Sequence, residues 1–250
     1  MLSDKDVVDS LNVARRIQRA FLPSEDYIQK TIPDSFVLFL PKDIVSGDFY
    51  WVEQVNDTIL FAVGDCTGHG VPGAMMAKLC YQILDQSLKE FGMVIPNHIL
   101  DKTLDLLSNK INVSNTNIPE GMDVALCALT GYNLQYSGAH NPLWIVRKGE
   151  LIECRATRQG ISKTPYPIPF EKIELNLQHG DIIYIFSDGF QDQFGGENNK
   201  KFKPAQFKNS LLEINNLPMN LQKIALENAF NEWKGEREQT DDVCVMGVKI

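Results

Sequence analysis

The sequence predicts an α+β fold in which antiparallel sheets are layered against pairs of helices, preceded by an N-terminal helix. The order of segments predicts this: short β-rich runs, two helical segments, a long series of strands, two more helical segments and a last strand. Several neighbouring strands are joined by tight links that contain Gly or Asn, which is typical of hairpins. This order fits antiparallel layers better than a doubly wound parallel sheet.

The N-terminal helix is expected over residues 5–21. Apolar residues recur there at spacings of three and four, at Leu11, Ala14, Ile17 and Phe21, and Pro23 follows the end of the pattern. A helix of about two heptads is marginal in water unless it packs on something. It therefore needs a partner, which is either this domain's own sheet or a second subunit.

The remaining segments follow from changes of pattern along the chain. Residues 35–65 form short β-rich runs, with a turn expected at Asn56 and Asp57. Further helices are predicted over residues 74–89, 96–113, 204–216 and 218–234. Further strands are predicted over residues 123–129, 134–137, 143–146, 151–154, 173–177, 182–186 and 243–248. Residues 155–170 contain several prolines and are expected to form a surface flap.

Composition limits the class of protein. With 250 residues and 44% hydrophobic content, the chain can bury a sizeable core as one large domain or two small ones. The net charge of -8 argues against a nucleic-acid partner, because neutralising phosphates requires clustered Lys and Arg. No run reaches the roughly 18 apolar residues of a membrane helix, and the first residues lack the features of a signal peptide. We therefore expect a cytoplasmic location.

The five cysteines indicate neither a disulfide framework nor a zinc site. They are odd in number, widely spaced and without a CxxC pair. We expect reduced thiols, mostly in the core.

Four aspartates share a local pattern, because each stands where an apolar strand meets a loop and three have a neighbouring glycine. They are Asp48, Asp65, Asp188 and Asp241. Each one alone is more often an ordinary turn residue than a ligand. Several such carboxylates converging would repel one another unless a cation neutralised them. Oxygen ligands without nearby His or Cys favour Mg²⁺ or Mn²⁺ over Zn²⁺.

Five short sequence motifs, which occur in a fixed order, favour metal ligands over ordinary turn residues for these aspartates. They are residues 41–50, 64–74, 137–142, 186–189 and 240–243, which carry PKDIVSGDFY, GDCTGHGVPGA, SGAHNP, FSDG and TDDV. Through these blocks the chain resembles the PPM (protein phosphatase type 2C) superfamily, specifically its bacterial SpoIIE/RsbU-type branch. The resemblance runs from the N-terminal helix, which ends in IQRAFLP, to the C-terminus. It implies a four-layer α-β-β-α sandwich with two central antiparallel sheets, residues 25–250 as the phosphatase domain and residues 1–24 as a regulatory or linker helix.

The resemblance also implies two Mn²⁺ or Mg²⁺ ions per active site. Asp48 and Asp65 would bind them, Asp65 would bridge, and the backbone carbonyl of Cys66 would contribute. Asp188 and Asp241 would complete the pair, with Asp242 the less favoured candidate for the last position. Two such ions would lower the pKa of a bridging water and orient the phosphate for in-line displacement.

Three further residues stand near these blocks. His69 could donate a proton to the leaving oxygen, although such a histidine is more often structural or supports the ligands. His140 is expected to be structural, bonding a loop within the core. Asp123 stands where the family often has a small or hydroxyl residue, and it either tunes the site electrostatically or faces solvent. The residue that anchors phosphate is not assigned.

The expected function is hydrolysis of phosphoserine or phosphothreonine on a regulatory protein, which the resemblance suggests is a STAS-type anti-sigma-factor antagonist. One alternative is a pseudophosphatase that binds a phosphoprotein without hydrolysing it. Another is a hydrolase of small phosphate esters, which no P-loop or Rossmann glycine pattern supports. The resemblance further suggests an upstream sensor domain and a homodimer formed through the N-terminal helix.

Overall fold

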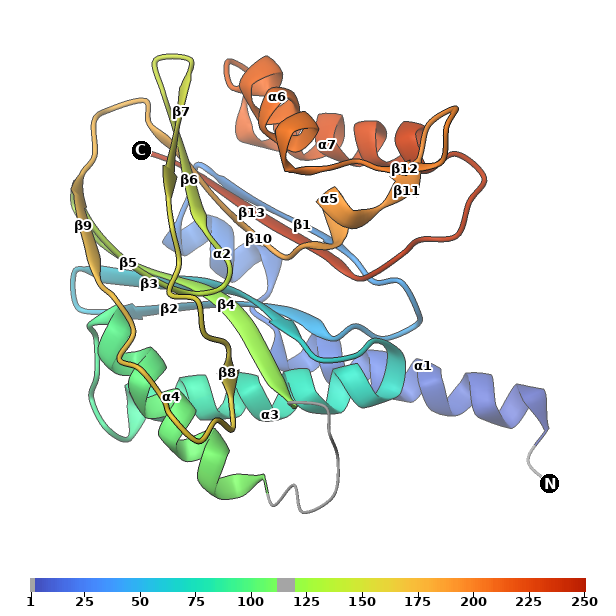
Figure 1. Cartoon of the computed structure of the whole chain (residues 1–250), viewed down its shortest axis with the longest axis horizontal. Coiled ribbons are helices and arrows are strands. Elements are labelled where there is room, and N and C mark those ends of the chain that lie inside the picture. The colour runs from blue at the N-terminus through green and yellow to red at the C-terminus, as the bar shows by residue number, and fades with distance from the viewer. Residues whose placement is uncertain (1–2, 112–119) are drawn as a thin grey trace.

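The computed structural model describes residues 3–111 and 120–250 and has four layers, with helices on the outer faces of two packed sheets (Figure 1). One sheet has the strand order β1 (Ser35–Leu40), β13 (Val243–Lys249), β10 (Ile182–Phe186), β6 (Leu143–Arg147) and β7 (Glu150–Cys154). The other has the order β2 (Asp48–Val55), β3 (Thr58–Cys66), β4 (Gly121–Thr130), β5 (Asn133–Ala139) and β9 (Ile173–Asn176), with β8 (Ile161–Ser162) paired to β4. All of these pairings are antiparallel. The predicted sandwich is confirmed.

The helices cover the two outer faces in pairs. On the β2–β9 sheet lie α3 (Gly70–Lys89) and α4 (Pro96–Lys110), and on the β1–β7 sheet lie α6 (Pro204–Ile214) and α7 (Met219–Lys234) (Figure 1). The short helix α5 (Gly189–Asp192) follows β10 directly, and a small ribbon of β11 (Phe194–Gly195) and β12 (Lys200–Lys201) comes next. None of the helices within residues 3–111 and 120–250 has the length and apolarity that crossing a bilayer requires.

Three apolar layers alternate with the sheets, as the period of two along each strand requires. Residues such as Trp51 and Leu126 pack against α3 and α4, while Trp144 and Phe186 pack against α6 and α7. The middle layer joins the two sheets, and its members include Phe61, Val63, Ala125, Tyr136, Ile183, Ile185, Cys244 and Met246. Side chains alternate along a strand. An aspartate at a strand end therefore also points into the space between the sheets when it is in phase with the residues of this middle layer.

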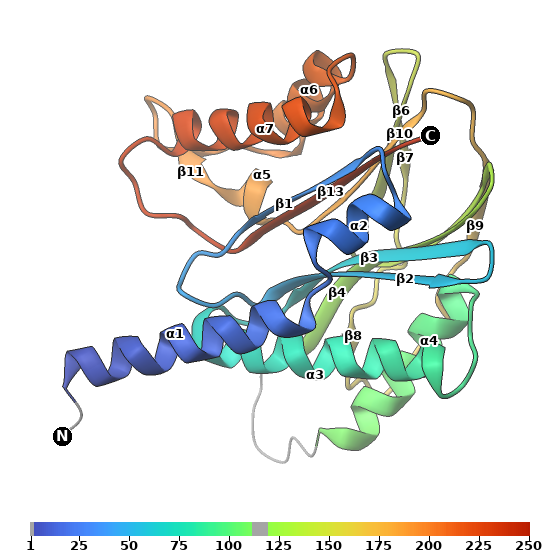
Figure 2. The ribbon, with the colours of Figure 1, turned by 180° about the vertical axis from the view of Figure 1, so that it is seen from behind.

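The N-terminal helix α1 (Asp4–Phe21) packs through its last turns only. Its C-terminal end meets α3, where the ring of Phe21 lies 5.1 Å from that of Tyr81. Its N-terminal half projects from the body of the protein (Figure 2). Ile17, which was predicted on the packed face, is 60% exposed, whereas the polar Gln18 is buried.

Several boundaries differ from the predicted ones. α3 begins at Gly70 instead of residue 74, and α4 ends at Lys110, so residues 112 and 113 of that prediction lie outside the described residues. The short elements α2 (Glu25–Thr31), α5, β8, β11 and β12 were not predicted. The flap prediction for residues 155–170 is partly wrong, because Ile161 and Phe170 are buried while Pro165 to Pro169 are largely exposed.

Candidate active site

Three aspartates form a row across the ends of β2, β3 and β4. Asp48 is directly opposite Asp65 in the β2–β3 pair, and Asp65 is directly opposite Asp123 in the β3–β4 pair. Side chains in such positions lie on one face, with Cβ atoms about 4.5–5.5 Å apart. Because Phe61, Val63 and Ala125 point into the layer between the sheets, the row lies on that inner face.

The other sheet supplies the facing carboxylates. Asp188 is the second residue after β10 and Asp241 stands two residues before β13, and these strands are neighbours. The N–H of Asp188 donates to Oδ2 of Asp65 at 3.4 Å. An open cleft brings together Asp65, Cys66, His69, Asp123, His140, Asp188 and Asp241. Of the described residues that line the cleft, none is a lysine or arginine.

Asp48 lies outside this lining because it is almost completely buried, at 2% exposure. It is held from both sheets. Its Oδ2 accepts a 2.5 Å hydrogen bond from the hydroxyl of Ser187, which precedes Asp188, and its N–H donates to Oγ of Ser46 at 3.0 Å. The Ser187 hydroxyl also accepts from the N–H of Cys244 at 2.9 Å. Asp48 thus joins the two sheets next to the cleft.

Burial and mutual repulsion make ionisation of these carboxyl groups unfavourable. Burial raises the pKa of Asp48 well above its ordinary value, and repulsion from Asp65 adds to the shift, while the Ser187 hydrogen bond opposes it. Burial and then the Asp188 carboxylate raise the pKa of Asp65 in the same direction. Desolvation, followed by Asp192, Asp241 and Asp123, raises the pKa of Asp188 to about 6, although the residue is accessible from the cleft.

This donor set suits a hard divalent cation, since positive charge would relieve the repulsion and carboxylate oxygens are the ligands that Mg²⁺ and Mn²⁺ prefer. As the side chains stand, no group of three or more His, Cys, Asp or Glu among residues 3–111 and 120–250 is arranged to hold an ion. Mg²⁺ sites commonly use one or two carboxylates and keep several waters, so such a group is not required. The chemistry of the donors therefore fits the expected metals.

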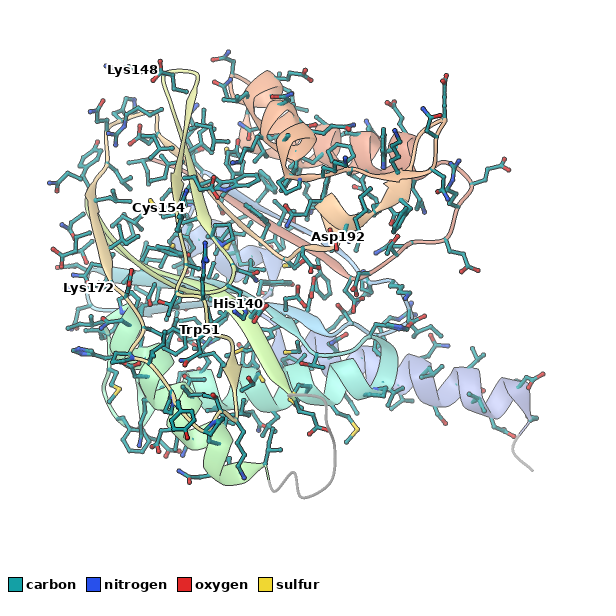
Figure 3. All side chains as sticks on the ribbon, in the orientation of Figure 1. Trp51, His140, Lys148, Cys154, Lys172 and Asp192 are labelled. Carbon is teal, nitrogen blue, oxygen red and sulfur yellow. The ribbon has the colours of Figure 1, made fainter. Side chains whose placement is uncertain are left out.

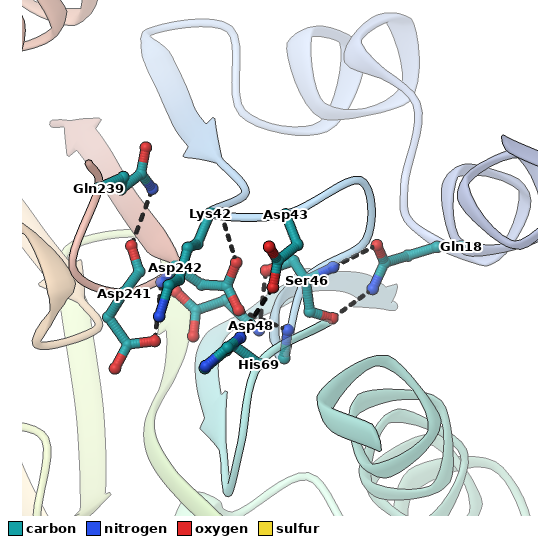
Figure 4. Close-up of polar contacts among 10 residues, drawn as sticks. Gln18, Lys42, Asp43, Ser46, Asp48, His69, Gln239, Asp241 and Asp242 are labelled. Carbon is teal, nitrogen blue, oxygen red and sulfur yellow. Dashed lines mark hydrogen bonds and ion pairs between the residues drawn. The ribbon is translucent and has the colours of Figure 1, made fainter. Parts of the chain in front are cut away.

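Asp241 and Asp242 have different surroundings, which separates the two candidates for the last ligand. Asp241 lies in the cleft and is exposed. Asp242 is buried, and its Oδ1 and Oδ2 accept from the N–H groups of Lys42 and Gly47, both at 2.8 Å (Figure 4). Asp242 thus anchors the loop between β1 and β2 from which Asp48 emerges.

The glycines of this region allow loops to meet closely. A Cβ on Gly47 would lie 2.3 Å from the carbonyl oxygen of Gly68, and one on Gly73 would lie 2.1 Å from the same atom. Only glycine fits at either position. The loop before β2 is thereby packed directly against the loop that carries His69.

Two histidine–aspartate pairs flank the cleft. His69 Nδ1 lies 2.7 Å from Asp43 Oδ2, between two loops (Figure 4). His140 Nδ1 lies 2.9 Å from Asp123 Oδ1.

The prediction that His140 bonds a loop within the core is wrong for its side chain, which is 48% exposed in the cleft wall, while its backbone N–H does bond the loop carbonyl of Thr157 at 3.0 Å. Figure 3 shows His140 between the two sheets.

The sequence contained a signal for this pair that the prediction missed. The β4–β5 hairpin turns at residues 131 and 132, and counting back from Thr130 opposite Asn133 places His140 opposite Asp123. The same count from the Asn56–Asp57 turn places Asp48 opposite Asp65.

Cys66 lies at the end of β3, and its thiol is buried. Burial raises the pKa of the thiol well above its ordinary value, and the neighbouring Cys80 adds to the shift. A thiol of this kind stays protonated, which leaves the backbone carbonyl of Cys66 as the group that would serve a metal.

Comparison with known proteins places this site in a family. The family described as Stage II sporulation protein E (SpoIIE) matches residues 56–250. The chain belongs to the SpoIIE family. The structure titled SiaA-PP2C domain of Pseudomonas aeruginosa is similar to this SpoIIE-family chain, with 31% identity, a TM-score of 0.91 and 98% of each chain covered.

Two further proteins are similar to this chain. Phosphoserine phosphatase RsbU of Bacillus subtilis (strain 168) is 24% identical over 195 residues, which is 74% of this SpoIIE-family chain and 54% of RsbU. The chain thus spans about half the length of RsbU. The PP2C phosphatase domain of SpoIIE from Bacillus subtilis, with a fragment of its regulatory domain, shares the fold at a TM-score of 0.71 and 17% identity, covering 87% of this chain and 63% of that one.

Proposed function

We propose that the chain is a metal-dependent protein phosphatase that hydrolyses phosphoserine or phosphothreonine. The observation that carries this proposal is the meeting of aspartates from both sheets in one cleft, where Asp65 and Asp123 face Asp188 and Asp241. Membership of the SpoIIE family, and similarity to a protein named phosphoserine phosphatase, support the same function.

In this proposal Asp48, Asp65, Asp188, Asp241 and the carbonyl of Cys66 hold two Mn²⁺ or Mg²⁺ ions. When bound, such a pair activates water, orients the phosphate and stabilises the charge that develops during displacement. The protein's own groups keep the ligands in place. The N–H of Asp188 orients Asp65, the hydroxyl of Ser187 orients Asp48, and Asp242 fixes the loop that precedes Asp48.

For the substrate we propose a phosphorylated regulatory protein, of the STAS-type anti-sigma-factor antagonist class. The cleft is open, with Asp188 and Asp241 exposed at it, so a phosphorylated side chain on a folded protein can reach it. The test of this finer proposal compares catalytic efficiency on such a phosphoprotein with that on free nucleotides. Equal or better efficiency on nucleotides would favour a hydrolase of small phosphate esters.

The competing function is a pseudophosphatase that binds a phosphoprotein without hydrolysis. The observation in its favour is that no described group of three side chains is arranged to hold an ion. A phosphatase assay with and without Mn²⁺, on an aryl phosphate and on a phosphoserine protein, separates the two. We expect Mn²⁺-dependent release of phosphate from both substrates, whereas a pseudophosphatase releases none from either.

Residues 1–24 are proposed to be a regulatory element that forms a homodimer and joins an upstream sensor to the phosphatase domain. The exposed apolar residues Val13 and Ile17 support this, because they stand four residues apart on one face of α1 and are 49% and 60% exposed. An apolar helix face that projects from the body is more stable when another helix covers it.

A further inference from the structure

We propose that His140 is a catalytic residue that donates a proton to the leaving serine or threonine oxygen, and that Asp123 positions it. This inference rests on the proposed phosphatase function. The observation that carries it is a histidine–aspartate pair built into the wall of the carboxylate cleft, next to the predicted bridging ligand.

The pair leaves one ring nitrogen for chemistry. Asp123 Oδ1 lies 2.9 Å from Nδ1 of His140, so Nδ1 carries the hydrogen that this carboxylate accepts. Nε2 has no hydrogen-bond partner in the part of the chain that the structure describes. A histidine whose Nδ1 is fixed by a carboxylate and whose Nε2 is free is the arrangement that enzymes use for proton transfer.

The backbone of both residues is held by the sheet and its adjoining loop, which places the pair beside the predicted metal ligand Asp65. Asp123 sits within β4 directly opposite Asp65, so the two side chains are separated by about one strand spacing of 4.5–5.5 Å. His140 follows β5 with φ of 56°, and its N–H donates to the carbonyl of Thr157 at 3.0 Å. A left-handed conformation at a non-glycine residue is unfavourable unless its surroundings impose it, and such positions cluster at functional sites.

Gly160 leaves room for the pair. A Cβ at this position would lie 2.8 Å from Oδ1 of Asp123 and 3.6 Å from Nδ1 of His140. The segment between β7 and β8 therefore passes directly over the hydrogen bond that fixes the ring. Replacing Gly160 with alanine should shift the pair without removing either chemical group.

His69 is the other candidate for the proton donor, and its aspartate partner lies in a loop and not in a strand. Its partner Asp43 lies in the loop between β1 and β2. The His69 side chain is as exposed as that of His140, at 49% and 48%, so the difference lies in the partner and not in exposure. In contrast to Asp123, Asp43 does not belong to a sheet and has no strand neighbour among the metal-site aspartates. Since no lysine or arginine is among the described residues that line the cleft, these two histidines are its candidates for proton donation to the substrate.

The proposed step is a displacement at phosphorus with proton transfer from His140 to the leaving oxygen. The oxygen of a water forms a bond to phosphorus while the bond between phosphorus and the seryl oxygen breaks. The electron pair of the broken bond stays on the seryl oxygen, which takes the proton from Nε2 of His140. One proton of the water remains on the inorganic phosphate, and the other is released to solvent, from which Nε2 is protonated again.

The test compares leaving groups, since an aryloxide leaves without a proton while a serine alkoxide does not. His140→Gln should lower kcat on a phosphoserine protein by about 10²-fold or more, the usual contribution of a general acid. On p-nitrophenyl phosphate the same variant should stay within a few-fold of the parent. Across aryl phosphates of rising phenol pKa, the rate of the variant should fall more steeply than that of the parent.

Gly160→Ala should show the same selectivity, and His179→Gln, in the turn before β10, is the control for loss of a surface histidine. Equal losses on both substrates with an unchanged leaving-group slope would show that His140 is structural and would overturn the proposal. So would a selective loss in His69→Gln with none in His140→Gln. A parent protein that releases phosphate from neither substrate with Mn²⁺ would overturn the phosphatase function itself, a result distinct from both.

Discussion

The side-chain amide of Gln18 and the backbone of Ser46 hold each other by two hydrogen bonds. Nε2 of Gln18 donates to the carbonyl of Ser46 at 2.6 Å, and the N–H of Ser46 donates to Oε1 at 3.0 Å (Figure 4). Ser46 stands two residues before Asp48, and both Gln18 and Ser46 are buried. These bonds tie α1 directly to the loop that positions a predicted metal ligand, so a movement of α1 would act on that loop.

Gln18→Ala should impair both the fold and the metal site. It leaves two buried backbone groups of Ser46 without partners, which should lower the free energy of unfolding by about 1–3 kcal/mol. The freed loop should also weaken Mn²⁺ binding, so that a higher Mn²⁺ concentration is needed for half-maximal rate. Urea unfolding and a Mn²⁺ titration of phosphatase rate measure the two effects. Arg19→Ala, on an exposed neighbour in the same helix, is the control, and an unchanged Mn²⁺ requirement in Gln18→Ala would disconnect α1 from the site.

Asp65→Asn and Asp188→Asn should nearly abolish hydrolysis, because loss of a metal-site carboxylate removes several kcal/mol of transition-state stabilisation, or orders of magnitude in rate. Mn²⁺ at about 100 times its Kd should stabilise the parent by about 2.7 kcal/mol, a gain that both variants should lose. Thermal unfolding with and without Mn²⁺ measures this effect independently of activity. Asp57→Asn, at the turn end of the same hairpin, should retain both properties. Full activity of the variants in chelator-treated buffer would refute the metal site.

Asp241→Asn and Asp242→Asn should separate metal binding from loop anchoring. Asp242→Asn replaces one of the two oxygens that accept a backbone N–H with an NH2 group that cannot accept, so it should lower the free energy of unfolding by about 1–3 kcal/mol. Asp241→Asn should leave stability without Mn²⁺ unchanged or slightly higher, since it removes an exposed repulsive charge, yet it should lose activity. Urea unfolding and the phosphatase assay on both variants test this. The reverse pattern would make Asp242 the ligand.

Stability without metal should depend on the protonation of Asp188. Its pKa is raised to about 6 by desolvation and by neighbouring carboxylates, above the ordinary value of 3.8. The folded protein therefore binds this proton more tightly than the unfolded chain, so the contribution is full below the ordinary pKa and is lost as the pH rises through about 6. Melting temperatures in chelator should fall between about pH 4 and pH 6, and fall less in Asp188→Asn. An equal fall in both proteins would exclude Asp188 as the titrating group.

Mn²⁺ should reverse that trend, because the ion requires the ionised carboxylates. Apparent Mn²⁺ affinity, measured by thermal shift, should weaken as the pH falls below about 6. An affinity that does not change across this range would show that the Asp188 proton does not compete with the metal.

Ile17→Asp should weaken self-association without unfolding the protein, since Ile17 is already 60% exposed. Sedimentation should show a dimeric parent and a lighter variant, with Arg15→Asp on the opposite helix face as the control. A shortened chain that begins at Ser24 is a less specific test, because it also removes Gln18 and its contact with Ser46. A monomeric parent with an unchanged Ile17→Asp variant would show that α1 is not an interface.

The strand-end positions of the aspartates could be predicted because apolar runs and turns are local features. Their convergence is not local, since α3 and α4 separate Asp65 from Asp123 in the chain although the two are neighbours in the sheet. The family resemblance supplied that information for the ligands but not for the His140–Asp123 pair. The contact of Gln18 with Ser46 could not be predicted, because hydrophobic spacing cannot show that a glutamine is buried to bond a backbone.

The row of Asp48, Asp65 and Asp123 also gives the protein a safeguard against misfolding. Because successive side chains alternate in direction, a slip of β2 by one residue would turn Asp48 toward α3 and bring Phe49 into the space between the sheets. That error would place a carboxylate in the apolar layer beneath α3 and a large ring among the remaining aspartates at once. A molecule with a misaligned hairpin would therefore be too unstable to persist as a partly active enzyme, so that proteolytic quality control, and not weak catalysis, would be its fate.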